Sequence, residues 1–94
     1  ARTFQTDLPH ALREAGVISA MRGLERRARK YLDESLDVAQ RQGARFEHAQ
    51  TLLARGRIGR SFDWPDAQEQ VTAGRDALIE LGAEFALSHP AAPE

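Results

Sequence analysis

The sequence predicts an all-α protein made of two antiparallel helix hairpins followed by the start of a fifth helix. Alanine, the strongest helix former, fills 16 of the 94 positions, and leucine fills 10. The β-branched residues that favour strands are few. Between glycines and prolines, small and aliphatic residues recur at steps of three and four, which is typical of one helix face.

The first helix is expected to begin near Pro9, because proline is favoured in the first turn of a helix. Thr6 or Asp7 supplies its cap, and the helix runs to about Arg22. Gly23 then ends it, as a residue that readily leaves the helical conformation.

The second and third helices are bounded in the same way. The second spans residues 24–42 and stops at Gly43, where a left-handed cap belongs. The third runs from about Arg45 to Arg60. One narrow face of the second helix carries Leu24, Ala28, Leu32, Ser35 and Ala39.

The fourth helix follows a turn over residues 61–66, with Asp63 as its expected capping acceptor. It is expected to run to Leu81, and Gly82 ends it. A further helix then starts over residues 83–87. The inner face of the fourth helix carries Ala67, Val71, Gly74, Leu78 and Leu81.

The two hairpins repeat one another. Residues of the first helix recur 40 positions later, as Gly16 does at Gly56. Residues of the second helix recur 39 positions later, and we expect Ala28, Ala67 and Gly74 to lie at close helix contacts. The expected organisation is a lead-in (1–8), a repeat domain (9–87) with units 9–43 and 44–82 and a partial third helix (83–87), and a flexible tail (88–94).

The order of small and large residues in the second unit resembles a tetratricopeptide repeat. Gly56 lies late in the first helix of this unit, and Trp64 lies in its turn. The stretch from Ala49 to Gly82 is 34 residues long, which is the repeat length of that family. The closing proline of that family is missing from both units, and arginines stand in the first turn. The positions that carry the resemblance are Gly16, Ala28, Leu32, Ser35, Gly56, Trp64, Ala67, Val71 and Gly74.

The glycine–alanine pairs at the hairpin ends are similar to those of helical repeats in large bacterial signalling ATPases. Some of those proteins carry a cyclase or a LuxR-type DNA-binding domain. The resemblance implies a cytoplasmic repeat module, C-terminal to an ATPase domain, that binds a protein partner or another domain of its own chain.

Composition excludes several classes of function. A net charge of −1 argues against a dedicated nucleic-acid binder, and the absence of cysteine excludes disulfides and thiolate sites. Apolar runs do not exceed two or three residues, so no membrane span is expected. We therefore expect no membrane partner, and we do not expect this segment to bind nucleic acid.

No pattern of catalytic or cofactor-binding residues is found. His10 and Glu14 lie one helical turn apart, but no further metal ligand accompanies them. Residues 56–61 imitate short phosphate-binding and RNA-binding motifs without the flanking strands that those motifs need. We expect no catalysis, no metal and no cofactor.

Two groups of arginines are candidate binding residues. In the repeat family the first helix of each unit lines the concave surface, so the resemblance places Arg13, Arg57 and Arg60 there, either gripping carboxylates or merely solvated. A basic patch is formed by Arg22, Arg26, Arg27, Arg29 and Lys30. This patch either binds an acidic partner or is neutralised by Asp33 and Glu34 at i,i+4 spacing.

The sequence thus favours a non-catalytic protein-interaction module within a larger bacterial regulator. The alternative is a self-contained helical bundle that binds nucleic acid or a small acidic effector through its arginines. The apolar residues Phe4, Leu8 and Leu12 further predict that the N-terminal end adjoins other repeats or self-associates.

Overall fold

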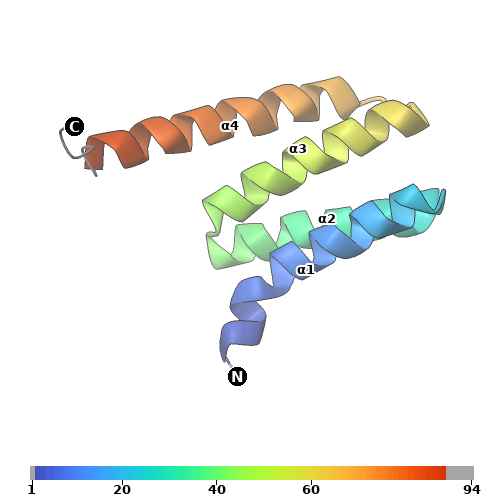
Figure 1. Ribbon diagram of the computed structural model, residues 1–94, viewed down its shortest axis with the longest axis horizontal. Coiled ribbons are helices and arrows are strands. Elements are labelled where there is room, and N and C mark those ends of the chain that lie inside the picture. The colour runs from blue at the N-terminus through green and yellow to red at the C-terminus, as the bar shows by residue number, and fades with distance from the viewer. Residues whose placement is uncertain (1, 89–94) are drawn as a thin grey trace.

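Four α-helices make up the part of the chain that the computed structural model describes, residues 2–88, with side chains described over residues 7–84 (Figure 1). The helices are α1 (Arg2–Met21), α2 (Glu25–Gln42), α3 (Arg45–Phe62) and α4 (Ala67–Ser88). No strand occurs within residues 2–88. The prediction of an all-helical chain is therefore confirmed.

The turns that follow α1 and α3 share one backbone geometry, which also occurs after α2. Gly23 and Asp63 both have positive φ angles, of 74° and 60°. In each turn the backbone amide of the following residue donates to the carbonyl oxygen five residues earlier. Leu24 donates to Ser19, and Trp64 donates to Gly59. The prediction that Asp63 caps the fourth helix is wrong, because Asp63 ends α3 in a left-handed conformation that Asp tolerates.

Helix α1 begins earlier than the sequence predicted. It already starts at Arg2, so Pro9 lies inside the helix and residues 2–8 are not a separate lead-in. Proline lacks the amide hydrogen of the helical ladder and crowds the preceding turn, which bends a helix. Figure 1 shows such a bend in the N-terminal part of α1.

Helix α4 runs without interruption through Gly82 to Ser88, so a separate helix does not begin at Ala83. Gly43, the counterpart of Gly82 in the first unit, has a φ angle of 67° and ends α2. Glycine is compatible with both conformations. Of the predicted flexible tail, Ser88 belongs to α4, and residues 89–94 lie outside the described part of the chain.

The helices pack in sequence order. α1 lies mainly against α2, and α3 lies mainly against α4. α3 also touches α2 and, over a smaller area, α1. Within residues 2–88 the backbone of α4 approaches neither α1 nor α2, so α4 forms one edge of the molecule (Figure 1).

The same glycine contact occurs within each helix pair. A Cβ atom added to Gly16 would lie 2.7 Å from the Leu32 side chain and 3.3 Å from the Ala28 carbonyl oxygen. One added to Gly56 would lie 2.6 Å from the Val71 side chain and 2.8 Å from the carbonyl oxygen of Ala67. Both glycines are needed because the facing helix is too close for a side chain.

A second correspondence lies one to two turns away. The Ser35 hydroxyl donates to the Pro9 carbonyl at 2.7 Å, and a Cβ atom on Gly74 would lie 2.9 Å from the Ala49 carbonyl. Ala49 is 40 positions after Pro9, and Gly74 is 39 positions after Ser35, by subtraction along the sequence. All nine positions that carry the resemblance to the tetratricopeptide repeat are buried: Gly16, Ala28, Leu32, Ser35, Gly56, Trp64, Ala67, Val71 and Gly74.

Candidate functional site

Arg57 and Arg60 are exposed on α3, three residues apart and hence on one face of the helix. Within the described residues neither makes a hydrogen bond or an ion pair. Their guanidinium groups are therefore available to an incoming ligand.

Arg13 is placed differently from the other two candidate arginines. Its side chain is only 12% exposed, and its Nη1 atom donates to Glu47 Oε1 at 2.7 Å and to Thr51 Oγ1 at 3.3 Å. Its Nη2 atom lies 2.9 Å from His10 Nδ1. Arg13 therefore joins α1 to α3, and its charge is already balanced by a carboxylate.

The contact of Arg13 continues into a buried polar chain. The Thr51 and Ser35 hydroxyls share a hydrogen bond of 2.8 Å, and both residues are fully buried. Because the single Ser35 hydrogen goes to the Pro9 carbonyl, Thr51 is the donor in this bond. The chain ties α1, α2 and α3 together at the middle of the molecule.

An apolar hollow of about 280 Å³ lies between α1 and α3, close to Arg57. Met21 at its edge is 80% exposed. Arg57 precedes Ser61, a lining residue, by one helical turn. The hollow is lined by Val17, Ala20, Met21, Ile58, Ser61 and Phe62. We call these six residues the α1–α3 hollow.

The basic patch is not neutralised by the i,i+4 pairs that the sequence suggested. The Arg29 guanidinium lies over the Trp64 ring, 5.1 Å from its centroid, and Asp33 instead accepts from Arg55 Nε at 2.7 Å. No ion pair links Lys30 to Glu34 within the described residues. Arg22, Arg26, Arg27 and Lys30 are exposed, and the last three border a shallow hollow on α2 together with Leu24, Glu25, Tyr31 and Glu34.

Arg55 is a buried cation that the sequence analysis did not single out. Its Nε atom binds Asp33, and its Nη1 atom donates to Asp66 at 3.2 Å and to Gln70 at 2.6 Å. Its guanidinium lies 5.0 Å from the centroid of the Trp64 ring. The partners are 11–22 residues away in sequence, so no local spacing could have revealed them.

Trp64 packs over the helix pairs from the turn between α3 and α4. Its ring stacks on Phe62 with centroids 5.8 Å apart, and its Nε1 atom donates to Glu25 Oε2 at 2.8 Å. Arg29 and Arg55 both contact the ring. Trp64 is therefore a residue of the α2–α3 contact and is not available for recognition.

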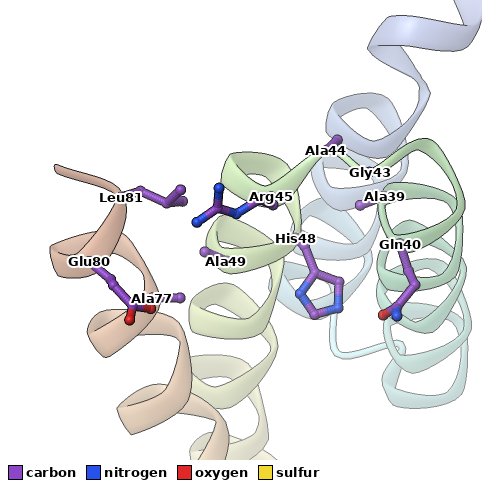
Figure 2. A pocket seen from close by; sticks show the side chains of 10 residues that line it. All are labelled: Ala39, Gln40, Gly43, Ala44, Arg45, His48, Ala49, Ala77, Glu80 and Leu81. Carbon is purple, nitrogen blue, oxygen red and sulfur yellow. The ribbon is translucent and has the colours of Figure 1, made fainter. Parts of the chain in front are cut away.

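A second hollow, of about 270 Å³, lies over the N-terminal part of α3 between α2 and α4. Figure 2 shows that His48 extends from α3 toward α2, where Gln40 lies, whereas Arg45 and Leu81 lie between α3 and α4. Arg45 donates to both carboxylate oxygens of Glu84, at 3.0 and 2.9 Å, and this hydrogen bonding raises the pKa of Arg45. Of the remaining lining residues, Glu80 is charged and the others are alanines and a glycine.

His10, which the sequence places one helical turn from Glu14, lies next to a cation. His10 faces the Arg13 guanidinium, and Glu47, next to His48, binds the same arginine. Over the residues with described side chains, no group of three metal-ligating residues occurs. No helix in that part of the chain has the length and apolar character to cross a membrane.

Comparison with known proteins identifies no relative. No protein-family model, no curated protein and no solved structure matches the chain. The function must therefore be argued from the α1–α3 hollow and from the exposed arginines.

Proposed function

We propose that the two helix pairs are consecutive tetratricopeptide-like units and that they form an open array. The support is internal. Gly16 faces Ala28 and Leu32 as Gly56 faces Ala67 and Val71, at offsets of 40 and 39 residues. Chance similarity of composition would not reproduce the same contacts in space.

In such an array, α1 and α3 are the first helices of their units and line one side of it. We propose that this side binds an extended segment of a protein partner or of another domain. The observation that carries the proposal is the α1–α3 hollow together with Arg57, which lies one helical turn from the lining residue Ser61, and Arg60 on the same helix; neither arginine has a partner among the described residues. An apolar hollow and unpaired cations on the same helices suit a segment that carries an apolar side chain and a negative charge.

The bound segment would carry an apolar side chain and a carboxylate. The apolar side chain enters the hollow between Met21 and Ile58, where it leaves water. The carboxylate binds the forked guanidinium of Arg57 or Arg60. The module is non-catalytic and needs no cofactor, since binding alone is its task.

A random 12-residue peptide display library, selected on the immobilised protein, tests this proposal. We expect the enriched peptides to combine Asp or Glu with an aliphatic or aromatic residue. Their affinity should fall at least tenfold in the variant Arg57→Glu/Arg60→Glu, because two attractive charges become repulsive. Arg75→Glu is the matched control, because Arg75 is also exposed but lies on α4. Enriched peptides that bind the Arg57/Arg60 variant unchanged would contradict the proposal.

One observation favours a second candidate, binding of a nucleic acid or a small acidic effector through the basic patch. Arg26, Arg27 and Lys30 are exposed around one hollow without ion-pair partners among the described residues. Phosphate binding at this patch would weaken steeply with added salt. Titration of a labelled DNA duplex at two salt concentrations separates the candidates, and we expect no salt-dependent complex.

The resemblance to repeats of bacterial signalling ATPases adds a proposal about context. We propose that the module works in the cytoplasm, within a larger regulator, and that its partner is a second protein or the ATPase or output domain of that regulator. The sequence of the full reading frame tests this directly, by the presence or absence of such a domain.

A further inference from the structure

The face of α3 that packs on α2 is built from residues with counterparts in the first helix pair. Ile58 packs against the core cluster that contains Leu32 of α2. Trp64 binds Glu25, and His48 lines the same hollow as Gln40. The contacts of Ile58 and Trp64 join the two units, and His48 and Gln40 line the hollow beside them.

Forty positions earlier, no helix within residues 2–88 lies against the same face of the first unit. The counterparts of His48, Ile58 and Trp64 are Leu8, Ile18 and Leu24, by subtraction of 40 from each number. They are 39%, 48% and 40% exposed. Three apolar side chains thus lie exposed at the positions where the second unit binds a neighbouring helix.

α4 presents the complementary face. It is the counterpart of α2, and Gln40 of α2 corresponds to Ile79, 39 positions later. Ile79 is 64% exposed, and within residues 2–88 no helix other than α3 lies against α4. Among the described residues, nothing therefore covers the α3-like face of α1 or the α2-like face of α4.

We propose that these two faces bind one another, so that α4 of one copy packs on α1 of a second copy as α2 packs on α3. This inference rests on the proposed repeat. In the assembled pair, Ile79 of one copy lies against Leu8 of the next, in place of the polar neighbours Gln40 and His48. Apolar contact at this position supplies the driving force for association.

The remaining counterparts are compatible with this packing. Asp33 and Arg55 form an ion pair between α2 and α3. Their counterparts between two copies are Thr72 of α4 and Ala15 of α1, which bring no charge into the contact. The counterpart of Thr51 is Ala11, an exposed small residue that allows close approach. Because the two faces differ, the contact is heterologous, and each added copy leaves one face free for the next.

Sedimentation velocity of the chain and of two charge variants tests the proposal. The wild-type weight-average mass should rise with concentration beyond twice 10.4 kDa. Leu8→Glu and Ile79→Glu each destroy one of the two faces, so each variant alone should remain a monomer. An equimolar mixture should form a dimer and stop there, because one intact face remains on each variant.

Phe46→Glu is the control, since Phe46 is 53% exposed and has no place in either face. It should associate like the wild type, and circular dichroism verifies that every variant keeps its helices. Ile18→Glu provides a second variant of the α1 face. A wild-type monomer at millimolar concentration would overturn the proposal, as would variants that stay monomeric when mixed, or loss of association in only one of them. The Arg57→Glu/Arg60→Glu variant should still associate, so failure of peptide binding and failure of stacking are separable.

Discussion

Replacement of Gly56 by alanine is the most demanding test of how closely α3 and α4 pack. The added methyl carbon would lie 2.6 Å from Val71 Cγ2, 2.6 Å from the Val71 amide nitrogen and 2.8 Å from the Ala67 carbonyl oxygen. A side-chain methyl can rotate away, but the two backbone atoms move only if α4 itself moves. Gly56→Ala therefore forces the two helices apart.

The size of the effect follows from two opposing contributions. Overpacking costs about 1–3 kcal/mol, with backbone clashes at the upper end, and alanine regains about 1 kcal/mol as the better helix former. We expect Gly56→Ala to lower the free energy of unfolding by about 1–2 kcal/mol. Urea unfolding followed by circular dichroism measures this as a lower midpoint with an unchanged slope.

Gly82→Ala is the matched control in the same helix pair. Apart from the surrounding turns of α4 itself, no atom of the described residues lies within 4 Å of the position that its methyl group would occupy, and α4 is helical there. We expect a gain of about 1 kcal/mol from helix propensity alone. A Gly56→Ala protein as stable as the wild type would refute the close packing, and a destabilising Gly82→Ala would refute the continuity of α4.

Four further substitutions probe other contacts through the same urea midpoint. Ala67→Leu should cost on the order of 1–3 kcal/mol, because Ala67 faces Gly56 across the helix contact; coincident melts would disprove the repeat alignment at this position. Ser35→Ala should cost about 1–3 kcal/mol, because two buried polar groups lose their partner; a neutral result would mean that water replaces the hydroxyl. Arg55→Met should cost about 1–3 kcal/mol, less than for a fully buried pair because both partner carboxylates are about half exposed; a stabilised variant would refute its role in joining the units. Arg45→Gln should leave the midpoint unchanged, since its pair with Glu84 is exposed; a clear loss would contradict that.

The helices themselves follow from local signals in the sequence. Gly23 and Gly43 end helices where the sequence places them, because a left-handed residue at a helix end favours glycine. The small residues Ala28 and Gly56 lie between helices because larger ones would not fit. Such signals involve neighbours within one or two turns, so they are readable without a structure.

The errors occur at residues that are compatible with two conformations. Pro9 can begin a helix or bend one, and Gly82 can end a helix or continue it. At Gly43 the chain turns and α3 packs back on α2, whereas at Gly82 the helical hydrogen bonds simply continue. The packing of the following segment against the rest of the chain decides whether the helix ends or continues, and the local sequence does not contain that information.

The candidate site was only partly predictable for a related reason. Arg57 and Arg60 lie exposed on one face of α3, but Arg13 is paired with Glu47, which lies 34 residues away. Asp33 likewise binds Arg55 of α3 and not its helical neighbour Arg29. Charged pairs between helices depend on tertiary packing, which i,i+4 spacing does not report.

Met21, at the edge of the α1–α3 hollow, is a direct probe of whether a protein segment binds there. Met21 is the only methionine of the sequence, so selective ¹³C labelling of methionine methyl groups gives one resonance for this chain. During titration with a peptide selected from the display library, we expect this resonance to shift and saturate at the peptide's own dissociation constant. A peptide that binds while the Met21 resonance stays unchanged would contradict the account.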